Sequence, residues 1–94
     1  MTTSQNIIKK RLEETFSDAI IKVTDESYRH KGHLSPEILE KGSHFFVQVT
    51  SKDFKGKMPL SRHRMVYALM NDLMRDNIIH ALRLELKTYE EADA

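Results

Sequence analysis

Apolar residues recur with a helical period in two stretches of the chain, residues 4–16 and residues 60–75. A spacing of three or four positions places such residues on one face of a helix, so both stretches are predicted to be amphipathic helices. Pro59 and Asn77 suit the start and the end of the second helix. The apolar positions are Ile8, Leu12 and Phe16 in the first stretch and Val66, Leu69, Met70 and Leu73 in the second.

Three shorter stretches have the composition and alternation of β-strands: residues 19–26, 44–50 and 79–87. β-Branched residues dominate the first stretch, and polar residues alternate with apolar ones in the other two. Successive side chains of a strand point to opposite faces of the sheet, so each strand is expected to bury one row. The expected buried rows are Phe45, Val47 and Val49 in the second strand and Leu82, Leu84 and Leu86 in the third.

The predicted element order is α-β-β-α-β, with an extra helical turn expected after Phe54. Three strands with the helices on one face form a two-layer α+β sandwich with a mixed sheet. The chain has 94 residues, which suits a single domain over residues 1–94. The connection over residues 27–43 is long for a link between strands, and such connections are commonly functional. Residues 89–94 are expected to fray.

The sequence contains no cysteine. This excludes a disulfide framework and a thiolate nucleophile, and the chain alone cannot hold an ordinary iron–sulfur cluster. No apolar run approaches the roughly 18–20 residues of a membrane span, and the first residues lack the pattern of a secretory signal. We therefore expect a cytoplasmic protein with no membrane partner; for a eukaryotic source, an organelle is the alternative location.

Charge is unevenly distributed, although the formal net charge is only +1. Residues 52–64 are strongly basic, whereas residues 65–94 carry an excess of acidic side chains. A basic stretch of this kind can contact phosphates or an acidic protein surface, and a solvated loop and helix start is the plain alternative. The basic residues are Lys52, Lys55, Lys57, Arg62 and Arg64.

The candidate chemistry rests on histidines, because imidazole is the commonest metal ligand in proteins. His80 opens the third predicted strand with the parity of its leucines, so it is expected to face the helix-covered side of the sheet and to be partly buried. His30 and His33 form an H-x-x-H pair in the long connection, which falls short of a complete zinc site. His44 leads the second strand, where periodicity favours a structural role. On periodicity alone, His80, His30 and His33 are also more often structural or surface residues than metal ligands.

His63 lies between Arg62 and Arg64 in the first turn of the long helix. A helix N-terminus favours negative charge, so this group can meet a phosphate or a carboxylate. Alternatively, Arg62 lays its stem across the edge of the core and pairs with a carboxylate of the same chain. The sequence contains no nucleophile motif, no phosphate-binding glycine loop and no H-E-x-x-H, so we expect no enzymatic activity.

Five short motifs occur in order along the chain: Asp25-Glu26-Ser27-Tyr28-Arg29-His30, Gly42-Ser43-His44-Phe45, Phe54-x-Gly56-Lys57, Arg62-His63-Arg64-Met65-Val66-Tyr67 and Ile79-His80-Ala81-Leu82. Each motif alone is unspecific, but the ordered set is specific. It resembles the BolA family over residues 5–88, which is nearly the whole chain.

The resemblance implies a class II KH-like α+β fold and a partner, a monothiol glutaredoxin, in a heterodimer. It also implies that the two proteins share a [2Fe–2S] cluster, for which the glutaredoxin cysteine and glutathione supply thiolates. By position, the implied ligands on this chain are His80 and His30, with His33 as the alternative to His30. The implied role is that of an adaptor or regulator in iron–sulfur trafficking or iron homeostasis. Alone, the chain is expected to hold no cofactor and to be a monomer or a weak homodimer.

BolA-like proteins are also described as transcription regulators that bind DNA. A KH-like fold usually binds nucleic acid through a G-x-x-G loop, whereas the corresponding turn here reads Gly56-Lys57-Met58-Pro59, without the second glycine. The basic stretch can still contact phosphates. The residues expected to bind DNA or a protein partner are Lys55, Gly56, Lys57, Arg62, His63 and Arg64.

Overall fold

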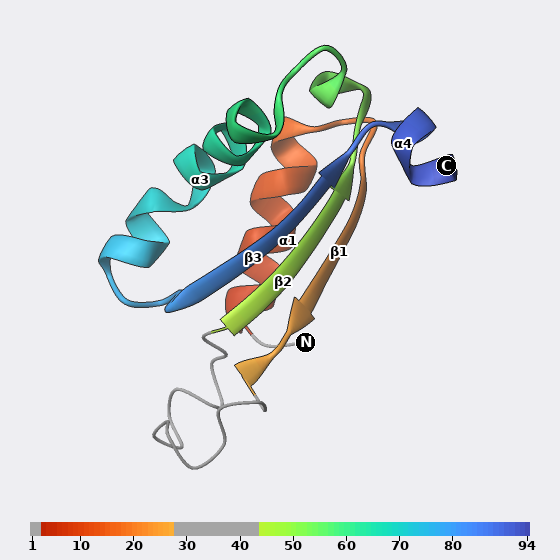
Figure 1. The fold of residues 1–94 in the computed structure, drawn as a ribbon. Coiled ribbons are helices and arrows are strands. Elements are labelled where there is room, and N and C mark those ends of the chain that lie inside the picture. The colour runs from red at the N-terminus through yellow and green to blue at the C-terminus, as the bar shows by residue number, and fades with distance from the viewer. Residues whose placement is uncertain (1–2, 28–43) are drawn as a thin grey trace.

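The computed structural model describes residues 3–27 and 44–94 (Figure 1). Within these ranges the predicted order α-β-β-α-β is confirmed, and two short helical elements are added to it. No helix in this part of the chain is long and apolar enough to cross a membrane. His30 and His33 lie outside the described residues. The elements are α1 (Thr3–Thr15), β1 (Ile20–Asp25), β2 (His44–Thr50), η2 (Lys52–Phe54), α3 (Pro59–Arg75), β3 (Ala81–Lys87) and α4 (Tyr89–Asp93).

The three strands form one mixed sheet in the order β1-β2-β3. β1 and β2 are antiparallel, with Val23 opposite Val47, and β2 and β3 are parallel, with Val47 opposite Leu84. Parallel neighbours need a crossover connection, and α3 supplies it. Helices α1 and α3 cover the same face of the sheet (Figure 1). The protein is therefore the two-layer α+β sandwich that the sequence predicts.

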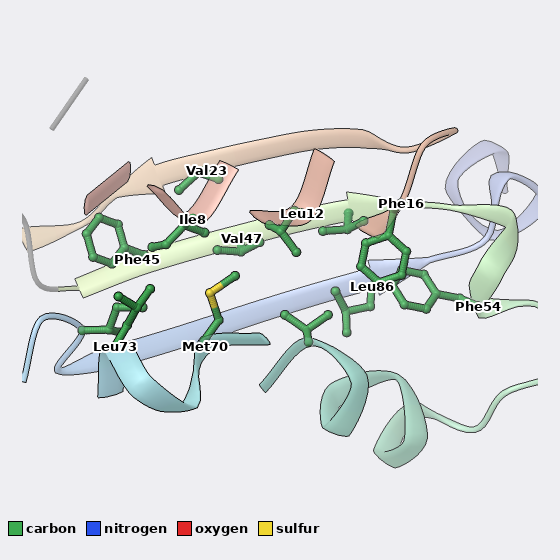
Figure 2. Packing of buried hydrophobic residues seen from close by; sticks show 13 residues of the cluster. Ile8, Leu12, Phe16, Val23, Phe45, Val47, Phe54, Met70, Leu73 and Leu86 are labelled. Atoms are coloured by element: carbon green, nitrogen blue, oxygen red, sulfur yellow. The ribbon is translucent and has the colours of Figure 1, made fainter. Parts of the chain in front are cut away.

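The core lies between this face of the sheet and the two helices (Figure 2). β2 supplies its centre, because Phe45, Val47 and Val49 are each no more than 1% exposed. The predicted alternation of β2 and the predicted apolar stripes of both helices are confirmed, with Leu69 at the margin of the core. The two helices contribute the buried residues Ile8, Leu12, Val66, Met70 and Leu73.

A bidentate ion pair joins the two helices beside the core. Arg11 of α1 donates to both carboxylate oxygens of Asp72 of α3, at 2.6 and 2.9 Å. The same guanidinium donates to the carbonyl oxygen of Leu69 at 2.9 Å. Hydrogen bonding by Arg11 lowers the pKa of Asp72 to about 2, because it stabilises the charged form of the carboxyl group.

Helix α3 ends in a Schellman motif that determines where β3 begins. Asn77 has a left-handed backbone with a φ of 59°. Its amide donates to the carbonyl oxygen of Met74 at 3.2 Å, and the next amide donates to that of Leu73 at 2.9 Å. The strand predicted from residue 79 therefore begins only at Ala81, and the earlier boundary is wrong.

The same turn changes the environment of His80. Ile79 takes the core position at 2% exposure, whereas His80 lies in a bend before β3 and is exposed. The prediction that His80 shares the inward row of the β3 leucines and is partly buried is therefore wrong. Strand parity does not extend into the turn, because the backbone there is not extended.

The connection between β2 and α3 contains a 3₁₀ turn, η2. It ends at Phe54, so the helical turn expected after this residue instead leads up to it. The hydroxyl of Ser51 caps the turn by accepting from the amide of Asp53 at 3.0 Å. The carboxylate of Asp18 accepts from the amide of Lys52 at 2.9 Å and from the Ser51 hydroxyl at 3.0 Å. These hydrogen bonds, the one from the Lys52 amide above all, lower the pKa of Asp18.

Tyr89–Asp93 form a short helix, α4, in the segment that is expected to fray. Thr88 and Glu91 form a capping box in which each side chain accepts from the backbone amide of the other, and this satisfies two amides of the helix start. The hydroxyl of Tyr89 donates to the carbonyl oxygen of Asp18, which attaches α4 to the segment before β1. A helix of five residues is too short to produce a periodic apolar signal.

Met70→Ala is expected to lower the free energy of unfolding by about 2–5 kcal/mol, because Met70 is fully buried in the core. Leu60→Ala is the matched control, since Leu60 lies in the same helix and is 61% exposed; its effect is expected to stay within about 0.5 kcal/mol. Urea unfolding followed by circular dichroism measures both values. Equal losses in the two variants would contradict the placement of Met70 in the core.

Candidate functional site

Two histidines meet at one end of the sheet. His44 is the first residue of β2 and stands opposite Ala81, the first residue of β3. His80 directly precedes Ala81, so the parallel register brings the two imidazoles together. Their ring centroids lie 6.1 Å apart, with the ring planes at 70°. Sequence reasoning missed this pair, because alternation within a strand does not reveal which strands are neighbours.

Hydrogen bonds to its main-chain amide and carbonyl hold His44 in place. The amide of Glu26 donates to the carbonyl oxygen of His44 at 2.7 Å. The amide of His44 donates to the hydroxyl of Ser27 at 3.1 Å, and the amide of Ser27 donates to the carboxylate of Asp25 at 2.8 Å. The end of β1 therefore fixes the start of β2, while the Schellman motif of α3 places His80.

An ion pair and a cation–π contact lie next to the histidine pair on the face of the sheet that α1 and α3 leave uncovered. Arg83 of β3 donates to the two carboxylate oxygens of Glu26 at 2.8 and 3.3 Å. The guanidinium carbon of Arg83 lies 3.8 Å from the ring centroid of Phe46, which is two residues after His44 in β2. Because Glu26 is only 8% exposed, this ion pair is partly shielded from water. The positive charge of Arg83 is balanced by the carboxylate of Glu26.

The two imidazoles supply nitrogen donors at this end of the sheet. The sequence has no thiol, and within residues 3–27 and 44–94 no three or more His, Cys, Asp or Glu side chains are grouped so that they could hold a metal ion. A [2Fe–2S] cluster takes four ligands, which are thiolates or, on one iron, two histidines. The two imidazoles therefore fit a cluster whose thiolates come from other molecules, and they do not fit a cluster held by this chain alone.

Arg62 is directed inward, and its side chain is only 11% exposed. Its guanidinium forms an ion pair with Glu91 at 2.5 Å and donates to the carbonyl oxygens of Lys57 and Leu86 at 2.8 and 3.2 Å. It also lies over the ring of Phe54, 5.9 Å from the centroid. Of the two roles that the sequence leaves open for Arg62, these contacts match the internal ion pair, which attaches α4 to α3.

The other residues of the predicted partner or DNA surface lie around the start of α3. Two large apolar side chains, Met58 and Leu60, are 73% and 61% exposed among them. The Nδ1 atom of His63 lies 2.8 Å from the carbonyl oxygen of Pro59. Since a carbonyl oxygen accepts, this nitrogen is the donor, and in a neutral ring Nε2 carries the lone pair. The exposed members of the predicted surface are Lys55, Gly56, Lys57 and Arg64.

The histidine pair and the basic residues lie at opposite ends of α3 (Figure 1). The basic residues surround its N-terminal end, and His80 follows its C-terminal end. A helix of 17 residues is about 25 Å long. The structure thus brings His44 to His80 and keeps Lys55–Arg64 apart from both.

The fold and the site define a small α+β domain with an exposed imidazole at the end of its sheet. A family model described as BolA-like protein matches residues 12–91. The chain therefore belongs to the BolA family, and the resemblance seen in the ordered motifs is confirmed.

Known relatives agree with this placement. The chain is 37% identical over 87 residues to the DNA-binding transcriptional regulator BolA of Vibrio cholerae, covering 93% of this chain and 76% of that protein. It is 33% identical over 91 residues to SufE-like protein 1, chloroplastic/mitochondrial, of Arabidopsis thaliana, but spans only 23% of that protein's length. The solved BolA domain of SufE1 from Arabidopsis thaliana superimposes with a TM-score of 0.81 at 31% identity, covering 97% of this chain and 98% of that one.

Acid is expected to weaken the attachment of α4 through Glu91. The ion pair with Arg62, and next the hydrogen bond from the Thr88 amide, lower the pKa of Glu91 from 4.5 to about 2. The ionised carboxylate therefore stabilises the folded state fully above pH 4.5, and this contribution is lost as the pH falls toward 2. Glu91→Gln is expected to remove part of the decrease in unfolding free energy over this pH range, measured by urea unfolding.

Glu90→Gln is the control for this experiment, because Glu90 is the adjacent, exposed carboxylate. It is expected to keep the pH dependence of the wild type. If Glu91→Gln keeps it as well, the ion pair does not stabilise the end of the chain.

Proposed function

We propose that this chain is an adaptor that binds a monothiol glutaredoxin and shares a [2Fe–2S] cluster with it, in iron–sulfur trafficking or iron homeostasis. The observation that supports this most directly is the position of His80, which is exposed at the end of the sheet beside a second imidazole. An exposed imidazole nitrogen at the end of the sheet is accessible to a metal cluster on the surface of another protein. The lack of cysteine agrees with the proposal, because the thiolates then come from the glutaredoxin and from glutathione.

In the proposed complex, His80 supplies one nitrogen ligand and His30 the second, with His33 as the alternative. Both alternatives lie in the segment between Ser27 and His44, whose two ends are joined by a hydrogen bond of 3.1 Å. His30 follows Ser27 by three residues, and a chain spans at most about 3.6 Å per residue. His30 is therefore closer in sequence to the end of β1 than His33 is, and both lie outside the described residues.

The mixed ligand set has a consequence for how the cluster forms and behaves. Histidine ligation raises the reduction potential of a [2Fe–2S] cluster above that of an all-cysteine one. Neither protein completes the ligand set alone, so the cluster depends on the heterodimer. The proposed role is non-enzymatic, and the relative from Vibrio cholerae is likewise named as a regulator.

His80→Ala is expected to change the visible absorption and circular dichroism spectra of the complex formed with a monothiol glutaredoxin, glutathione, iron and sulfide, because one nitrogen ligand is removed. His63→Ala is the control for the spectrum alone, since it removes an imidazole at the other end of α3, within the predicted partner surface. Iron and sulfide analysis of the heterodimer isolated by size exclusion measures cluster content. An unchanged spectrum and an unchanged affinity in His80→Ala would overturn the ligand role.

DNA binding around the start of α3 is the alternative function. It is supported by the name of the Vibrio cholerae relative, a DNA-binding transcriptional regulator, and by the exposure of Lys55, Lys57 and Arg64. Arg62 is engaged inside the protein, so the remaining three cations carry the proposed phosphate contacts. Because this surface and the histidine pair lie at opposite ends of α3, the two functions are compatible in one molecule.

Charge reversal at Lys57 or Arg64 is expected to weaken DNA binding. It is also expected to reduce the slope of log K against log salt by about one for each phosphate that the protein no longer neutralises. Lys22→Glu is the control, because Lys22 is an exposed cation in β1, far along the chain from this surface. Fluorescence anisotropy over a range of salt concentrations measures both quantities. Absence of binding at low salt would remove this alternative.

A further inference from the structure

The histidine pair at the starts of β2 and β3 has nearly the spacing of two ligands on one metal ion. The ring centroids of His44 and His80 lie 6.1 Å apart, and the planes cross at 70°. Two imidazoles on one tetrahedral ion, with metal–nitrogen bonds of about 2.0–2.1 Å, have centroids about 5 Å apart. Because His80 is exposed, rotation of its side chain can close the difference without movement of the strands.

The backbone beneath both residues is well defined. Neighbouring strands lie about 4.8 Å apart, and the parallel register places His80 one residue before Ala81, the partner of His44. The end of β1 holds the start of β2 through hydrogen bonds on both sides of the His44 peptide. A site on such elements is positioned more accurately than one built on loops alone.

The charges around the pair are compatible with a bound cation. Arg83 is the cation of β3 that lies nearest in sequence to His80, and it is paired with Glu26 at 2.8 Å. Its guanidinium carbon also lies 3.8 Å from the centroid of the Phe46 ring, so the cation has two partners. The positive charge next to the pair is therefore compensated.

The donor type selects the kind of ion. Neutral imidazole suits zinc, copper, nickel and iron, whereas magnesium and calcium prefer oxygen ligands. Each imidazole has two ring nitrogens, so one can bind the metal while the other keeps a hydrogen bond. Two protein ligands leave further coordination positions for water or another molecule, so the ion is expected to exchange readily.

We propose that His44 and His80 form a binding site for a single divalent transition-metal ion, with Zn²⁺ as the probe, on the chain alone. The site requires neither a glutaredoxin nor an iron–sulfur cluster. Separate experiments therefore test this proposal and the proposed adaptor function. It gives His44 a binding role, where periodicity favours a structural one.

Titration of the whole chain with Zn²⁺ alone tests the site by calorimetry and by ¹H–¹⁵N NMR of the imidazole rings. Zn²⁺ is expected to bind with one ion per chain and to shift the ring signals of His44 and His80 together. His44→Asn and His80→Asn are each expected to weaken binding by at least about tenfold, because each removes one of two ligands. Mg²⁺ at the same concentration is expected to leave the ring signals unchanged.

Two controls separate this site from the other histidines. His63→Asn removes an imidazole at the N-terminal end of α3 and is expected to leave the affinity for Zn²⁺ unchanged. A double variant, His30→Asn with His33→Asn, tests the H-x-x-H pair and is expected to retain the site. The proposal is overturned if no Zn²⁺ binds, or if the double variant loses binding while His44→Asn and His80→Asn keep it. Because His80 is exposed and precedes β3, His80→Asn remains informative should His44→Asn fail to fold, which the amide NMR spectrum shows.

Discussion

Strand β2 is hydrogen-bonded to a neighbour on each side, and its row of Phe45, Val47 and Val49 forms the floor of the core. Both long helices pack against that row, so the sandwich depends on burying it. Because side chains alternate along a strand, burial of this row directs His44 and Phe46 to the opposite face. The candidate site is thus a consequence of the alternation that creates the core.

Helix α3 connects two regions with different chemistry. At its start, Arg62 is drawn inward by Glu91 and by two carbonyl oxygens, and the neighbouring cations remain exposed. At its end, the left-handed Asn77 turns the chain so that Ile79 enters the core and His80 does not. A rigid helix between them keeps a surface suited to phosphate or protein contacts apart from one suited to metal ligation.

The long periodic elements could be predicted because their signals are local. The apolar stripe of α3 and the alternation of β2 follow from sequence spacing, and the structure confirms both. The start of β3 and the existence of α4 could not be predicted in this way. They depend on a Schellman turn after α3 and on the capping box of Thr88 and Glu91, which are hydrogen-bond arrangements without apolar periodicity.

The sequence by itself determined that any iron–sulfur centre on this chain must take its thiolates from other molecules, because it contains no cysteine. It also determined which row of β2 carries His44, since alternation is a property of neighbouring residues. Only the tertiary structure decided that β2 and β3 are parallel neighbours in a register that joins His44 to His80, and that Arg62 turns toward Glu91. Both outcomes depend on packing between segments that are far apart in the sequence. A pattern of neighbouring residues does not reveal which distant segments will pack together.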